Sequence, residues 1–224
     1  MWSKKILNSL DSIYSISRDG ITYVEKLFSY KHKNLKLSRL GINNYFKHLN
    51  THNKDFIIVS CSNVIDVKRV NLIAESLANI KIDNLVWTHF GDGINFNDLI
   101  NYCERYLKNK ITFNFPGRIS NKQIMDFYNQ NFVSLFINVS SSEGVPVSMM
   151  EAMSFGIPVI ATNVGGTSEI VNNDNGFLID NDPSPIQVSE KIIEYYDLSI
   201  DDKSKKRQFA YKTWKEKFNA DKNY

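Results

Sequence analysis

The sequence contains no uninterrupted apolar run of the roughly 18 to 20 residues that a membrane-spanning helix requires. Its opening, residues 1–17, is broken too often by charged and polar residues to form the apolar stretch of a secretory signal. We therefore expect the chain to remain in the cytoplasm.

Cysteine is scarce as well. The two cysteines, Cys61 and Cys103, lie far apart and match no spacing of metal-ligating cysteines. Reduced thiols are the ordinary state of cytoplasmic cysteines. Neither a disulfide, a zinc site nor redox chemistry is predicted.

The sequence also lacks a strong excess of charge of one sign. Its 27 Lys and Arg residues stand against 24 Asp and Glu, and the basic residues are dispersed along the chain. Nucleic-acid binding would call for a clustered basic face and a recognisable module, so we expect no nucleic-acid partner. The small basic surplus leaves open a peripheral contact with a negatively charged membrane, at its inner face.

The composition is that of a globular protein, with 42% hydrophobic and 23% charged residues. A chain of 224 residues has room for one substantial domain with additional elements. Two full Rossmann-like domains do not fit.

From about Asn53 onward, short apolar runs of strand length alternate with segments of helical periodicity. The runs show little alternation of apolar and polar residues, which is typical of strands covered on both faces. They are residues 55–62, 84–90, 111–115, 133–139 and 157–161. This order predicts βαβ units and an α/β fold, a Rossmann-like parallel sheet with helices on both faces, whose ligands bind at the carboxyl ends of the strands.

The two ends of the chain depart from this alternation. Residues 1–52 contain helical patterns, a turn at 15–20 and an extended stretch at 35–42, so we assign 1–42 to an appendage and linker and 43–202 to the main domain. Residues 203–224 predict a basic amphipathic helix with Phe209, Trp214 and Phe218 available for one face. We expect this helix to pack one edge on the sheet rather than to anchor in a membrane.

The most informative stretch is residues 140–171, SSSEGVPVSMMEAMSFGIPVIATNVGGTSEIV. It predicts a strand end, a loop, a short helix, a strand and a glycine-rich loop. Pro146 suits the helix start because its missing N–H would be unpaired there, and Gly156 ends the same helix. The free N–H groups of Val147 and Ser148 form a candidate anion site, which suits a diphosphate.

Two carboxylates accompany this helix. Glu143 precedes it in the loop and Glu151 lies inside it, so they can reach different parts of one bound molecule. Both can accept hydrogen bonds from sugar or ribose hydroxyls. Taken singly, each is more often a solvated or capping acid, but their combination with Gly144, Pro146 and Gly156 favours a ligand site.

These residues resemble the family 4 glycosyltransferases of the GT-B fold. That family carries the pattern S-x-x-E-G-x-P-x-x-x-x-E-A-x-x-x-G-x-P-V-I-A-T-x-x-G-G-x-x-E-I-V, and residues 140–171 match nearly all of it. The similarity extends to residues 60–77, 89–93 and 115–119 and to the linker at 40–42. It covers roughly the last four-fifths of the chain, which makes chance similarity in one motif a poor explanation.

The resemblance implies the C-terminal half of a GT-B fold, with residues 1–42 a remnant of the N-terminal domain and linker and most of the acceptor-binding half missing. The implied activity is retaining transfer of a sugar from a UDP- or GDP-sugar to a saccharide, polysaccharide or lipid-linked acceptor, in capsular or cell-surface polysaccharide biosynthesis. No metal or other cofactor is expected. The alternatives are a non-catalytic nucleotide-sugar-binding remnant, one part of a split enzyme that needs an N-terminal domain or partner chain, and a structural domain that binds no nucleotide.

Under this resemblance Glu143 lies beside the donor sugar, Glu151 binds the ribose hydroxyls and Lys68 neutralises the diphosphate. Departure of a nucleoside diphosphate builds negative charge, which a fixed ammonium and a helix start stabilise without a metal. Glu143 and Lys68 are therefore the catalytic candidates, although Lys68 taken alone would more often be a solvated charge. The other donor-binding candidates are Gly144, Val145, Pro146, Val147 and Ser148 at the helix start and Gly117, Arg118 and Ile119 around the base.

One position departs from the family pattern. Asn63 stands where the family often has an arginine that shares the diphosphate with the lysine. Either Arg69 or Arg118 compensates, or the donor is held without a second cation, or donor binding is weak.

Three other patterns are better explained by structure. Residues 180–182 spell D-x-D but are bracketed by turn formers, and residues 91–93 lack the third glycine of a dinucleotide fingerprint, so both predict turns. The histidines have no partner at ligand or triad spacing; they are His32, His48, His52 and His89.

Overall fold

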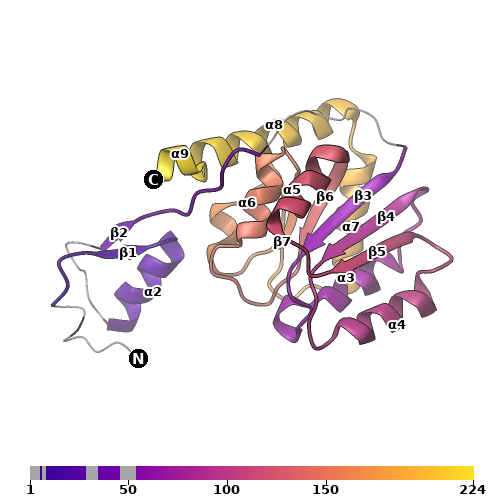
Figure 1. The fold of residues 1–224 in the computed structure, drawn as a ribbon, viewed down its shortest axis with the longest axis horizontal. Helices are drawn as coiled ribbons and strands as arrows, with labels where there is room; N and C mark the ends of the chain where they lie inside the picture. Colours follow the sequence, from indigo (N-terminus) through magenta and orange to yellow (C-terminus); the bar gives the residue numbers. More distant parts are fainter. Residues whose placement is uncertain (1–5, 7–8, 29–34, 46–53) are drawn as a thin grey trace.

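A computed structural model describes residue 6 and residues 9–28, 35–45 and 54–224 (Figure 1). Its centre is a six-stranded sheet with the order β5-β4-β3-β6-β7-β8, and every adjacent pair is parallel. The strands are β3 (Phe56–Cys61), β4 (Leu85–Phe90), β5 (Thr112–Gly117), β6 (Val133–Asn138), β7 (Val159–Thr162) and β8 (Gly176–Ile179). The predicted parallel α/β sheet is confirmed.

Helices cover both faces of the sheet (Figure 1). One face packs on α3 (Val70–Leu77), α4 (Phe96–Tyr106) and α7 (Pro185–Asp197). The other packs on α5 (Asn121–Gln130), α6 (Val147–Ser154) and α8 (Ile200–Lys217).

Strand β3 illustrates why the apolar runs do not alternate. Ile58 is buried in the core on one face, whereas Ile57 and Val59 are buried in the core on the other. Because neighbouring side chains point to opposite faces of a strand, a sheet with two covered faces needs apolar residues at consecutive positions. The runs of consecutive apolar residues therefore result from the two layers of helices that cover the sheet.

The N-terminal residues form a small unit of their own. Strands β1 (Ile13–Ser15) and β2 (Leu35–Leu37) pair in parallel, and α2 (Arg18–Phe28) lies between them in the chain. The expected turn at 15–20 is the junction of β1 and α2. β2 lies within the extended stretch that was expected at 35–42. β1 was not predicted, because a strand of three residues is too short to show a periodicity.

The linker between this unit and the main domain is fixed to the C-terminal end of the chain. Ile42 donates its N–H to the carbonyl of Phe218 at 2.7 Å, and its own carbonyl accepts from the indole of Trp214 at 3.2 Å. A last short helix, α9 (Ala220–Asn223), follows. The linker and the C-terminal end of the chain therefore meet.

The C-terminal helix corrects one expectation. It begins at Ile200 and its buried face carries Ala210, Trp214 and Phe218, whereas Phe209 is 41% exposed. Residues four apart share a helix face, and Phe209 is five positions from Trp214, so it points elsewhere. The prediction that Phe209 belongs to the packing face is wrong. Within the described ranges, no helix combines the length and apolarity that crossing a membrane requires.

Candidate functional site

The site lies where the strand order reverses. β3 and β6 are neighbours in the middle of the sheet, but the chain continues from β3 to β4 on one side and from β6 to β7 on the other. The loops after β3 and β6 therefore lead to opposite sides, and ligands of such sheets bind at the carboxyl ends of the strands at this switch point. The loop after β3 ends in the 3-10 helix η1 (Asp66–Lys68), and the loop after β6 carries Glu143.

Lys68 and Glu143 meet at this switch point. The ammonium nitrogen of Lys68 donates to Oε1 of Glu143 at 2.7 Å, and the amide of Asn138, the last residue of β6, donates to the same oxygen at 3.1 Å. The side chains are 23% and 9% exposed for Lys68 and Glu143. The structure thus brings the two predicted catalytic residues into contact.

The carboxyl of Glu143 remains acidic despite its burial. Burial alone raises its pKa, but hydrogen bonds led by that from Lys68, together with the positive charge of Lys68, lower it further than burial raises it. The net pKa lies below the ordinary value. Glu143 is therefore an anion at neutral pH, held by a cation that a diphosphate would also attract.

Helix α6 begins next to this pair. Pro146 is its N-cap with an extended backbone, and the helix runs from Val147 to Ser154, so the predicted helix start is confirmed. Among the described residues no side chain caps it. The first N–H groups of a helix have no acceptor inside the helix, so those of Val147 and Ser148 are available for an anion.

Glu151 lies on the other flank of α6. Its Oε1 accepts a hydrogen bond from the amide of Asn121, the first residue of α5, at 2.6 Å. Burial raises the pKa of Glu151, with the bond from Asn121 acting in the opposite direction. Burial, and secondarily the charge of Glu151, raises the pKa of Cys61, the last residue of β3, to about 12.

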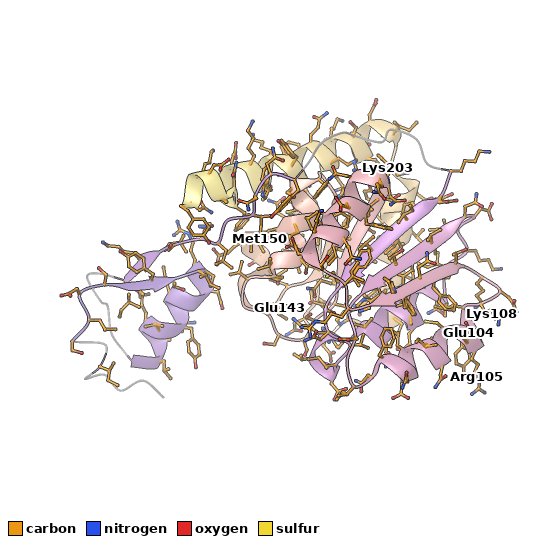
Figure 2. All side chains as sticks on the ribbon, viewed as in Figure 1. Glu104, Arg105, Lys108, Glu143, Met150 and Lys203 are labelled. Carbon is orange, nitrogen blue, oxygen red and sulfur yellow. The ribbon has the colours of Figure 1, made fainter. Side chains whose placement is uncertain are left out.

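Glu143 thus contacts the loop after β3, and Glu151 contacts the start of α5. Figure 2 shows Glu143 among the loops at one end of the sheet, whereas Lys203 lies at the opposite end. One bound molecule lying along the start of α6 would have an acid at each end.

A glycine turn supports the loop that carries Glu143. The 3-10 helix η2 (Gly165–Glu169) follows β7, and the N–H of Gly166 donates to the carbonyl of Gly144 at 2.9 Å. Gly165 has φ +51, and a Cβ there would collide with the carbonyl of Glu143. Only glycine allows this close approach of the two backbones.

The three candidate cation positions differ in their surroundings. The guanidinium of Arg69 donates to the carbonyls of Val139 at 2.6 Å and Asn181 at 2.7 Å and pairs with Asp182 at 2.9 Å. Its donors thus tie the end of β6 to the loop after β8. Asn63 and Arg118 are exposed, and Arg118 forms no ion pair within the described ranges.

The loop predicted to face the base follows the edge strand β5. Gly117 has φ +72, and its carbonyl accepts from the N–H of Gly91 at 2.9 Å, which joins the predicted turn at 91–93 to this loop. An open groove of about 760 Å³ adjoins the loop. Its lining includes Thr88, Phe90, Asn114, Pro116, Ile119 and Gln123.

The remaining sequence patterns serve the fold. Residues 180–182 form a bend after β8, and the described part of the chain contains no cluster of His, Cys, Asp and Glu side chains that could hold a metal. His89 is fully buried in β4, where Nδ1 lies 2.8 Å from the hydroxyl of Ser60. The other histidines, at positions 32, 48 and 52, lie outside the described residues.

Several residues of the site were missed in the sequence. Asn138 and Asn121, which position the two carboxylates, were not predicted. The glycine-rich loop was predicted, but not the support that its turn at 165–166 gives to the loop of Glu143. The adjacent glycines were a usable signal because such a pair permits close backbone contact. The two asparagines carried none, since their role depends on which loops the sheet order brings together.

The family model described as Glycosyl transferases group 1 matches residues 41–214. The GtfA subunit of a UDP-N-acetylglucosamine–peptide N-acetylglucosaminyltransferase from Streptococcus agalactiae is 28% identical over 167 residues, which cover 71% of this chain and 32% of that protein. The O-antigen biosynthesis glycosyltransferase WbnH from Escherichia coli is 36% identical over 84 residues, which cover 37% of this chain and 23% of that protein. The chain spans about a third or less of these curated relatives.

The fold also resembles that of Anabaena HepE, whose crystal structure contains UDP and glucose. The TM-score is 0.79 at 18% sequence identity, and the match covers 95% of this chain and 60% of that chain. The predicted GT-B, Rossmann-like fold is thereby confirmed.

Proposed function

The chain belongs to the glycosyl transferases group 1 family, and on that premise we propose that it is the donor-binding half of an enzyme that transfers a sugar from a nucleoside diphosphate sugar. The matched relatives are glycosyltransferases, and one of them is named for a UDP-sugar. HepE, which shares the fold, has been crystallised with UDP and glucose. A UDP-sugar is therefore the first donor to test, followed by a GDP-sugar.

One observation carries this proposal. The uncapped start of α6 lies at the switch point of the sheet, with the Lys68–Glu143 pair on one flank and Glu151 on the other. An uncapped helix start and an ammonium suit a diphosphate, and the two carboxylates suit hydroxyl groups on either side of it. A nucleoside diphosphate sugar has this order of groups, with ribose, diphosphate and sugar in sequence.

The proposed chemistry follows from the charges. As the bond between sugar and diphosphate breaks, negative charge grows on the leaving diphosphate, and Lys68 and the N–H groups of Val147 and Ser148 stabilise it without a metal. Glu143, an anion at neutral pH, faces the donor sugar, whose reacting carbon becomes electron-poor. We propose retention of configuration at that carbon, as in the family that the sequence resembles.

The proposed acceptor is a saccharide or a lipid-linked saccharide in the assembly of a surface polysaccharide. WbnH is named for O-antigen biosynthesis, which is the support for this choice. A lipid-linked acceptor would bring the enzyme to the inner face of the membrane, and that location stays a prediction.

We propose that the active enzyme also contains an acceptor-binding domain or a partner chain that packs on the N-terminal unit. The β1–β2 pair has strands of three residues and cannot bury a core of its own. Its unit exposes large apolar side chains, with Tyr14 63% and Tyr23 64% exposed. Additional strands and helices covering this unit would bury them.

Calorimetric titration tests the donor site. Purified chain is titrated with UDP, GDP and a panel of their sugars, with thermal shift as a second readout. We expect saturable heat and a raised melting temperature with one nucleotide and its sugars, because a ligand that binds only the folded state stabilises it. If no nucleotide or nucleotide sugar gives binding heat or a change in melting temperature, the chain is a structural domain that binds no nucleotide.

The second candidate is a donor-binding chain that turns over nothing by itself. The match covers about a third or less of the curated relatives, and in this fold acceptor groups come from the other half. Donor, acceptor and chain are mixed with and without a protein that supplies a GT-B acceptor domain. Transfer only in the mixture supports a split enzyme, and donor binding without transfer in either case supports a non-catalytic remnant.

A further inference from the structure

Glu169 joins parts of the molecule that are far apart in the sequence. It ends η2, and its Oε1 accepts hydrogen bonds from the backbone N–H groups of Arg18 at 2.7 Å and Asp19 at 3.1 Å. Its Oε2 accepts from the guanidinium of Arg39 at 2.9 Å. The side chains of Glu169 and Arg39 are only 15% and 19% exposed.

These contacts complete the start of α2. Ser17 accepts from the N–H of Gly20 at 2.9 Å, so a local serine and a distant carboxylate together satisfy the N–H groups that the helix cannot. Negative charge at this end of a helix is also favourable for its dipole. Bonds to a charged acceptor are about twice as strong as neutral ones. Glu169 therefore fastens the start of α2 to the main domain.

The contact between Glu169 and the start of α2 is connected to the loop of Glu143 through the glycine turn of η2. The start of α2 packs on η2, and Ser17 is placed so that a Cβ on Gly166 would come within 3.4 Å of its own Cβ. Gly166 in turn bonds to Gly144, and Gly165 touches the carbonyl of Glu143. The glycine turn thus contacts the start of α2 on one side and the loop carrying Glu143 on the other.

We propose that Glu169 is a positioning residue for the sugar end of the donor site. By holding the start of α2 against the glycine turn, it keeps the loop of Glu143 in the geometry that receives the donor sugar. This inference rests on the proposed function for the identity of the ligand, but the coupling itself is a property of the free protein. Arg39 assists because it neutralises Glu169 and belongs to the linker.

The test compares Glu169→Ala, Glu169→Gln and Arg39→Ala with the unchanged chain and with Glu190→Gln, an exposed acid on α7. Hydrogen exchange of the free proteins is followed in peptides that contain residues 18–19 and 143–147. We expect Glu169→Ala to speed exchange in both peptides and Glu190→Gln in neither. Glu169→Gln keeps an acceptor oxygen and should fall between them.

Calorimetry with UDP and with the UDP-sugar that the unchanged chain binds most tightly gives the second readout. Glu169→Ala should weaken the sugar-bearing donor about tenfold while bare UDP changes by less than about twofold. Should Glu169→Ala fail to fold, Glu169→Gln and Arg39→Ala show the same selectivity on a smaller scale. A loss common to UDP and its sugar would mean a merely structural joint.

The two proposals fail differently. Faster exchange at 18–19 with unchanged exchange at 143–147 overturns the positioning role, whether or not nucleotides bind. Absence of nucleotide binding in the unchanged chain overturns the proposed function, and the exchange of the free proteins still decides whether Glu169 controls the loop of Glu143.

Discussion

Nζ of Lys68 lies 2.7 Å from Oε1 of Glu143, although the two residues are 75 positions apart in the chain. Each comes from a loop that leaves the centre of the sheet, one after β3 and one after β6. The ion pair therefore joins the two loops at the point where the strand order reverses. A ligand with a diphosphate would compete with Glu143 for the ammonium.

Lys68→Met should weaken UDP and UDP-sugar alike, because both present the diphosphate to the ammonium. Loss of a hydrogen bond to a charged group is worth about 1.5 to 3 kcal/mol, or roughly 10- to 150-fold in affinity. Calorimetry measures it, and Lys215→Met on the exposed side of α8 is the matched control. Equal affinity of Lys68→Met and the control would exclude the diphosphate role.

Glu151→Ala should also weaken both ligands, by about 1.5 to 3 kcal/mol, because the ribose hydroxyls lose a charged acceptor. UDP made with 2′,3′-dideoxyribose lacks these hydroxyls and should bind the variant and the unchanged chain alike. Glu216→Ala on α8 serves as the control. A variant that loses as much affinity for the dideoxy compound as for UDP would place Glu151 elsewhere than at the ribose.

Glu143→Ala should distinguish the sugar from the nucleotide. The sugar-bearing donor loses an acceptor for its hydroxyls, whereas bare UDP gains from an ammonium released by its partner. We therefore expect weaker binding of UDP-sugar and unchanged or tighter binding of UDP in calorimetric titrations. Equal losses for the two ligands would instead make Glu143 a residue that stabilises the loop.

The fold was predictable because two-sided burial leaves a mark on consecutive residues. Ile57, Ile58 and Val59 are all apolar since they serve two cores, and such runs predict a buried parallel strand. The start of α6 was predictable too, because Pro146 restricts the local backbone whatever surrounds it. Both are signals of local sequence.

The contacts of the site carry no such local signal. The sequence left Arg69 and Arg118 as equal alternatives, and only the structure shows the guanidinium of Arg69 holding two loop carbonyls and Asp182. Phe209 looked equivalent to Trp214 until the register of α8 was known. Glu169 belonged to the family pattern, yet its bond to Arg39 depends on how the linker lies.

Stability should fall in mild acid because of His89. Its burial lowers its pKa from 6.5 to about 4, so the unfolded chain takes up a proton before the folded chain does. The stability that neutral His89 provides is complete above about pH 6.5 and is lost as the pH falls towards 4, by roughly 3 kcal/mol in total. Urea unfolding of the unchanged chain and of His89→Gln at several pH values measures the difference.

The variant His89→Gln cannot take up this proton, so its free energy of unfolding should decline less steeply between pH 6.5 and 4. Acidic residues titrate in both proteins and cancel in the comparison. Parallel curves for the two proteins would contradict the buried, neutral state of this histidine.

We expect a nucleoside diphosphate sugar to bind at the start of α6, between Glu143 and Glu151. Hydrogen exchange measured with and without a saturating UDP- or GDP-sugar tests it most directly. We predict slowed exchange in the peptides that contain residues 143–151 and Lys68, with no change in α8. A ligand that binds but leaves these peptides unchanged, or protects another part of the chain instead, would contradict it.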